Sequence, residues 1–199
     1  TGGSPVTSWV GRAGSASVDG SSTYQTAGLN GKPAVSFPAN SRLISTVASV
    51  STCSTLQIFM VFQTPVAAAA NTNSMLFYGV GDFSMNKVTS LQSSTSLLSG
   101  ETIVYGLKNP SVSEGRLGSS TYSRPANTPQ VLYSRHSTNG TVLSVNKSSI
   151  SLNLSSGMDA STNSSPASLL YTGGDEFIIG SVRQTTILSN PAFVLGECL

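Results

Sequence analysis

Short segments rich in β-branched and aromatic residues recur along the whole chain, and turns rich in Gly, Ser and Asn separate them. The clearest are PAVSF (33–37), SRLISTV (41–47), TLQIFMVFQ (55–63), SMLFYGV (74–80), ETIVYGL (101–107), QVLYSRH (130–136), TVLSVN (141–146), SISLNL (149–154), EFIIGSV (176–182) and AFVLGECL (192–199). Each has the length and composition of a β-strand, and no long helical periodicity lies between them. This pattern predicts an all-β domain, an antiparallel two-sheet sandwich of the jelly-roll type.

The composition of the chain argues against two kinds of partner, nucleic acids and membranes. Charged residues make up 9% of the 199-residue chain and the formal net charge is +2, whereas about 25% of a typical soluble domain is charged. Lys and Arg are scattered singly, which argues against nucleic acid as a partner. The longest apolar run, LQIFMVF (56–62), suits a buried strand and is too short for a membrane span. We therefore expect neither nucleic-acid binding nor membrane insertion.

One hairpin can be interpreted in detail from the sequence VLYSRHSTNGTVLSVN. Asn139-Gly140 offers the positive φ angles that a type I′ turn requires. A two-residue loop at that dipeptide would place Leu143 opposite His136 and Val145 opposite Ser134, and a longer loop would change the register.

The sequence does not decide whether the two cysteines form a disulfide or whether the glycosylation sequons are used. Cys53 and Cys198 lack metal-ligand spacing, so a long-range disulfide and two free thiols are both compatible with the sequence. Asn-x-Ser/Thr sequons begin at Asn139, Asn146, Asn153 and Asn163, and in a chain so rich in hydroxyl residues such matches arise by chance.

Two N-terminal stretches, SWVGRAGS (8–15) and TYQTAGLNGKPAVSF (23–37), resemble the opening signature of concanavalin A-like, laminin G-like jelly-roll modules. The matching residues are Trp9, Arg12, Gly14, Tyr24, Leu29, Asn30, Gly31, Lys32, Pro33, Ala34, Val35 and Phe37. The segments 56–65, 131–150, 176–182 and 192–199 resemble later strands of such modules in the same order. The resemblance implies two packed, curved antiparallel sheets. It also implies strands before Trp9 and past Glu197, so we expect one domain over 1–199 within a longer polypeptide.

The turn in the signature has a structural interpretation. Asn30-Gly31 supplies a tight turn before a strand. Pro33 then fits an edge position where no ladder N–H is needed. We predict a structural and not a catalytic role for this segment.

Catalysis is disfavoured by the acidic residues. Retaining glycosidases need two carboxyl groups about 5–5.5 Å apart, and glucanases that resemble this fold carry them at alternate positions of one strand. Here Asp175 and Glu176 are the only close pair, and adjacent strand residues point to opposite faces. The other acidic residues are isolated: Asp19, Asp82, Glu101, Glu114, Asp159 and Glu197. We expect no enzyme, no catalytic residue and no cofactor.

The sequence gives equally little support for a serine-histidine catalytic site or for a metal site. His136 is the only histidine and no Gly-x-Ser-x-Gly elbow accompanies it, so we interpret it as a packing or surface residue. Asp82 and Asp175 follow Gly-containing loops and could offer oxygen to calcium, but solvated or turn-capping roles explain both. We therefore predict no metal site.

Binding is the remaining function class. A site for sugars needs an apolar, aromatic platform with a few placed polar groups. Tyr78, Tyr105, Tyr122 and Tyr133 lie in or beside expected strands, and Arg116 and Arg124 flank the Gly/Ser-rich segment EGRLGSSTYSR (114–124). We predict a ligand contact formed by Tyr105, Arg116 and Tyr122, with core packing as the alternative for the tyrosines.

These observations favour a non-catalytic, lectin-like adhesion module of a secreted, cell-surface or virion-surface protein that recognises a neutral glycan. The alternative is a purely structural jelly roll, a capsid or tail decoration or a spacer, that acts through protein contacts. Either is compatible with a homo-oligomer formed through the parent protein.

Overall fold

The computed structural model describes residues 3–11, 14–46, 55–65, 75–82, 87–93, 103–109, 112–119, 122, 124–137, 140–154, 176–180 and 192–198. All regular structure in these residues is β, arranged as two antiparallel sheets. The predicted all-β, two-sheet sandwich is therefore confirmed. In these same ranges no helix is long and apolar enough to cross a membrane.

The first sheet has eight described strands and begins and ends with short ones. In spatial order they are β1 (Ser4–Pro5), β4 (Thr23–Leu29), β5 (Lys32–Phe37), β17 (Phe193–Cys198), β7 (Thr55–Gln63), β12 (Gln130–Ser137), β13 (Gly140–Val145) and β14 (Ser148–Ile150).

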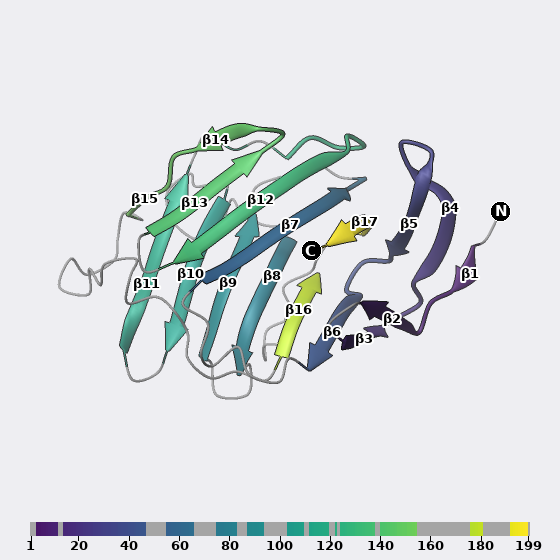
Figure 1. Ribbon diagram of the computed structural model, residues 1–199, viewed down its shortest axis with the longest axis horizontal. Coiled ribbons are helices and arrows are strands. Elements are labelled where there is room, and N and C mark those ends of the chain that lie inside the picture. Colours follow the sequence, from purple (N-terminus) through teal and green to yellow (C-terminus); the bar gives the residue numbers. More distant parts are fainter. Residues whose placement is uncertain are drawn as a thin grey trace.

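The second sheet has nine described strands. In spatial order they are β15 (Asn153–Leu154), β11 (Val112–Ser119), β10 (Ile103–Asn109), β9 (Lys87–Ser93), β8 (Met75–Asp82), β16 (Glu176–Gly180), β6 (Arg42–Thr46), β3 (Gly14–Asp19) and β2 (Ser8–Gly11). Figure 1 shows β7 and β12 of the first sheet passing across the strands of the second.

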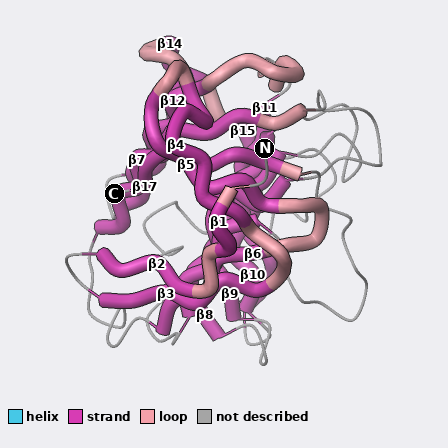
Figure 2. Tube along the Cα trace, turned by 90° about the vertical axis from the view of Figure 1, so that its right-hand side faces the viewer, coloured by secondary structure: helices cyan, strands magenta, loops and turns pink. Residues whose placement is uncertain are grey.

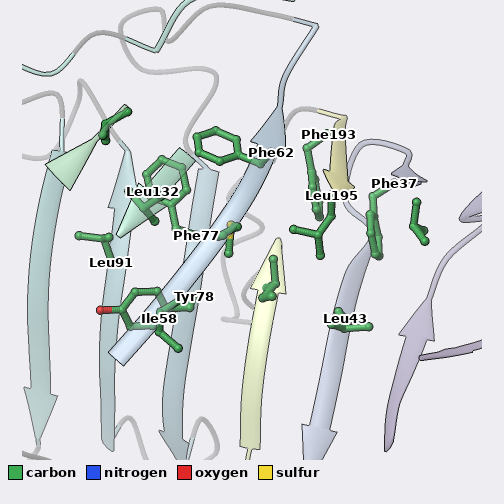
Figure 3. Close-up of a cluster of buried hydrophobic side chains, with 14 of the residues drawn as sticks. Phe37, Leu43, Ile58, Phe62, Phe77, Tyr78, Leu91, Leu132, Phe193 and Leu195 are labelled. Carbon is green, nitrogen blue, oxygen red and sulfur yellow. The ribbon is translucent and has the colours of Figure 1, made fainter. Parts of the chain in front are cut away.

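The core lies between the two sheets, because alternate residues of each strand point to opposite faces. Along β7 the burial alternates, with Ile58, Met60 and Phe62 buried. Figure 3 shows aromatic side chains from both sheets meeting in this layer. Phe62 packs edge-on against Phe77 with ring centroids 5.0 Å apart. Such edge-to-face pairs are a favoured aromatic geometry.

The Asn30-Gly31 turn has the predicted conformation, with φ angles of 46° and 72°. It joins β4 to β5, and β5 is an interior strand and not the edge strand that Pro33 suggested. The first β5 residue paired with β17 is Val35. Pro33 therefore precedes that ladder and its missing N–H costs no bond on the β17 side.

The predicted hairpin forms with a different register. Leu143 pairs with Ser134 and not with His136, which pairs with Thr141, and Gly140 is itself a ladder residue opposite Ser137. His136 is fully buried, and its Nδ1 lies 2.6 Å from the Thr141 Oγ1. The packing interpretation of His136 is confirmed.

Candidate functional site

An open groove of about 520 Å³ lies at the end of the sandwich where the chain passes from β1 to β2. Figures 1 and 2 show β1 and β4 beside β5 on one sheet and β2 and β3 at the end of the other. The lining residues are Pro5, Val6, Thr7, Ser8, Trp9, Val10, Tyr24, Pro33, Ala34, Val35 and Gly196. Its volume falls within the range of small-molecule sites, about 300–1,000 Å³.

The two aromatic residues of the groove come from different sheets. Tyr24 stands directly opposite Val35 in the β4–β5 ladder, and cross-strand partners share a face. Val35 is a core residue, so Tyr24 lies on the inner face of the first sheet. Trp9 stands opposite the buried Ala16 and so lies on the inner face of the second sheet.

The side chains of Tyr24 and Trp9 differ in how far they are exposed to solvent. Tyr24 is 41% exposed although it lies on the inner face, because it stands near the edge of the first sheet. Trp9 is partly buried and packs against the core. The groove is therefore the open margin of the core, with one accessible ring and one ring held by packing.

Backbone hydrogen bonds hold the segment that crosses between the sheets. The Val6 N–H donates to the Ser22 carbonyl at 2.9 Å, and the Val18 N–H donates to the Thr7 carbonyl at 3.0 Å. The first bond ties the segment to the residue before β4 and the second ties it to β3. Together they set the start of β2 and hence the position of Trp9.

The lining is uncharged, since none of its residues is Asp, Glu, Lys, Arg, His or Cys. Its polar side chains are the hydroxyls of Thr7, Ser8 and Tyr24 and the indole N–H of Trp9. Hydroxyls both donate and accept hydrogen bonds, whereas the indole only donates. Such a lining can hold a neutral, hydroxyl-rich ligand but offers no carboxylate or imidazole for proton transfer.

Tyr122 does not belong to an accessible site, and this corrects the sequence prediction. Its side chain is 4% exposed, its hydroxyl donates to the Gln130 Oε1 at 2.8 Å, and its ring lies edge-on to Phe77. Arg124, which flanks the same segment, is also buried. Tyr122 is therefore a core residue.

Tyr105 and Arg116 are placed by the backbone only, since their side chains lie outside the described part. Arg116 belongs to strand β11 and not to a loop, and it pairs with Gly106. Tyr105 pairs with Leu117 and with Leu91, whose side chain is buried. Tyr105 and Arg116 thus occupy successive ladder positions, and their contact with a ligand stays a prediction.

Of the other residues singled out in the sequence, Tyr78 lies in the core and several lie outside the described residues. Tyr78 is fully buried and its hydroxyl lies 2.9 Å from the Ser134 Oγ. Cys53, Asn139, Asn163 and Asp175 lie outside the described residues, so the disulfide question and these sequons are untested. Across the described ranges no group of three His, Cys, Asp or Glu residues could hold a metal ion.

Comparisons with solved structures show a likeness of fold. A structure of botulinum neurotoxin type C, whose cell entry depends upon interaction with two ganglioside molecules, superposes with a TM-score of 0.56 at 12% identity. The match covers 98% of this chain and 48% of that one. A receptor-binding domain gives 0.55 at 11% identity, over 92% and 43%. The binding domain of botulinum neurotoxin DC in complex with SialylT gives 0.52 at 11% identity, again over 92% and 43%.

The chain spans less than half the length of these structural neighbours. No family model and no curated protein matches the sequence. The neighbours therefore support the two-sheet sandwich, and the groove has to be interpreted from its own residues.

Gly3 gives a direct test of how the groove is assembled. A Cβ added at Gly3 would overlap the Tyr24 carbonyl oxygen, so Gly3→Ala should push β1 away from β4. We expect the Val6 amide to lose at least about tenfold of its hydrogen-exchange protection, because local opening of an edge needs less free energy than global unfolding.

The matched control is Gly31→Ala. Gly31 has a φ of +72° and open space around its Cβ position, so this change should cost about 1 kcal/mol through backbone strain. Val6 protection should stay unchanged relative to the rest of the sheet. Equal loss at Val6 in both variants would show that Gly3 does not hold β1 in place.

Proposed function

We propose that this chain is a non-catalytic glycan-binding module of concanavalin A-like jelly-roll type, belonging to a secreted, cell-surface or virion-surface protein. The observation that carries the proposal is the uncharged groove with Trp9 and Tyr24 on facing sheets. Sugar rings present C–H faces to aromatic side chains and hydroxyls to neutral polar groups, and this lining offers both. The absence of charge among the lining residues favours a neutral glycan.

The structural neighbours support a glycan as the class of ligand but not its neutrality, because a sialyl group carries a carboxylate. Two of them are described with a ganglioside or with SialylT, and both ligands carry sugars. The likeness is one of fold, so it supports a scaffold compatible with glycan binding and does not transfer a site.

Tyr24→Ala tests the proposal. We expect the wild-type chain to bind one class of neutral glycan saturably on an array, and the variant to bind at least about tenfold more weakly, or about 1.4 kcal/mol, because the most exposed ring of the groove is lost. Tyr24 is the right position because it lines the groove and is exposed, whereas Trp9→Ala would also remove core packing.

Tyr133→Ala is the matched control. Tyr133 lies between the buried Leu132 and Ser134 on β12, so it belongs to the outer face of the first sheet. Its loss should leave glycan binding unchanged. Binding that survives Tyr24→Ala, or that is lost equally in both variants, would place the ligand elsewhere.

A structural module that acts through protein contacts is the second candidate, and the outer face of the first sheet favours it. Phe59 stands opposite Tyr133 there, and Val131 and Val142 are exposed. Apolar residues gathered on one face suit a protein contact. A blank array from a folded chain, together with self-association in sedimentation, would support this function.

A further inference from the structure

Tyr24 has an apolar flank in the groove. Its cross-strand partner Val35 is 5% exposed and belongs to the core. Directly opposed residues have Cβ atoms about 4.5–5.5 Å apart. Pro33 lies two residues before Val35 and therefore on the same face. A ring stacked on Tyr24 would carry its neighbouring substituent over Val35 and Pro33.

The opposite wall is also apolar on its inner side. Val6 and Trp9 are partly buried and pack against the core. Thr7, which precedes β2, lines the groove and is exposed, so its hydroxyl lies at the mouth of the groove. Ser8 alternates with the inward-facing Trp9 on β2, so its side chain points to the outer face. The backbone N–H of Val6 and the carbonyl of Thr7 already have partners. The groove thus combines an apolar inner part with a hydroxyl rim.

An apolar inner part with a hydroxyl rim should favour some neutral sugars over others. A hydroxyl placed against Val35 would exchange contact with water for contact with an apolar side chain, which is unfavourable. A methyl group in the same place gains from burial. An acetamido group meets both requirements, since its methyl is apolar and its N–H and carbonyl can bond to hydroxyls at the rim.

We propose that the groove recognises a pyranose bearing a 2-acetamido group, with the acetyl methyl against Val6 and Val35 and the amide toward Thr7. This inference rests on the proposed glycan-binding function. It makes the acetamido group, and not a hydroxyl or a carboxylate, the determinant of specificity.

The first test compares two ligands that differ at one carbon. Methyl 2-acetamido-2-deoxy-β-D-glucopyranoside should bind the complete chain at least about tenfold more tightly than methyl β-D-glucopyranoside in titration calorimetry. Saturation-transfer NMR should give its strongest ligand signal at the acetyl methyl. N,N′-Diacetylchitobiose and N-acetyllactosamine then distinguish a polymer of this sugar from a galactose-capped glycoprotein arm as its source.

The outcomes separate this inference from the proposed function. Equal affinity for the two glycosides, or an acetyl methyl without signal, would overturn the acetamido proposal while glycan binding stands. If no glycoside and no array glycan binds, both proposals fail together.

Val6→Thr tests the position of the methyl group. This change keeps the shape of the side chain and adds a hydroxyl, so we expect the preference for the acetamido sugar to fall at least about threefold with little change in glucoside binding. Val142→Thr, on the exposed outer face of the first sheet, is the matched control and should keep the full preference. An unchanged preference in Val6→Thr would remove Val6 from the methyl contact.

Discussion

Phe37→Ala is expected to lower the free energy of unfolding by about 3–5 kcal/mol, the range measured for fully buried phenylalanines. Phe37 is completely buried on β5 and stands opposite Phe193 of β17. The two rings stack with centroids 4.5 Å apart and an interplanar angle of 4°. Figure 3 shows the two side chains side by side. Removing one ring leaves a cavity and exposes the face of the other.

The size of this loss is large relative to a typical domain stability of about 5–15 kcal/mol. Urea denaturation followed by tryptophan fluorescence measures it, since Trp9 is the single tryptophan. Phe59→Ala is the matched control, because Phe59 alternates with buried residues on β7 and belongs to the outer face. It should cost clearly less. Equal costs at both positions would contradict the burial of Phe37 in the core and the place of Phe59 on the outer face.

The sequence predicts the apolar strands well and the polar ones poorly. TLQIFMVFQ corresponds to β7 residue for residue, since its Ile, Phe and Val residues favour a strand with or without neighbours. By contrast, GSASVD and KVTSLQS form β3 and β9 with little intrinsic preference for strands. Their place is set by ladders with β6 and β10, and such pairing depends on sheet order, which a local pattern does not contain.

The groove could not be predicted from the sequence either, because it depends on how the strands pair. Trp9 and Tyr24 stand out in the sequence as parts of a resemblance, but their shared groove depends on the β2–β3 and β4–β5 registers. The β4–β5 register also shifts between Gln25 and Leu29, so counting from the Asn30-Gly31 turn does not give the partner of Tyr24. Tyr122 was wrongly predicted to be accessible. Its Gly/Ser-rich neighbourhood suggests an exposed loop, whereas its ring packs on Phe77.

Two buried tyrosines should make the fold sensitive to alkali. Burial raises the pKa of Tyr78, and the hydrogen bond with Ser134 opposes that shift only in part. Burial also raises the pKa of Tyr122, against the opposing charge of Arg124. Unfolded tyrosine titrates near pH 10. Since both folded-state pKa values lie above it, their stabilisation is complete below about pH 10 and is lost as the pH rises toward the folded values.

Each buried tyrosine should therefore remove about 1.4 kcal/mol of stability for every pH unit above about 10. Urea denaturation at several pH values between about 9 and 11.5 gives this slope, and Tyr78→Phe should reduce it by about half. Arg124, whose pKa burial lowers, is present in both proteins and cancels from their difference. If wild type and Tyr78→Phe lost stability at the same rate, the Tyr78 hydroxyl would be free to ionise in the folded chain, contrary to its burial between the sheets.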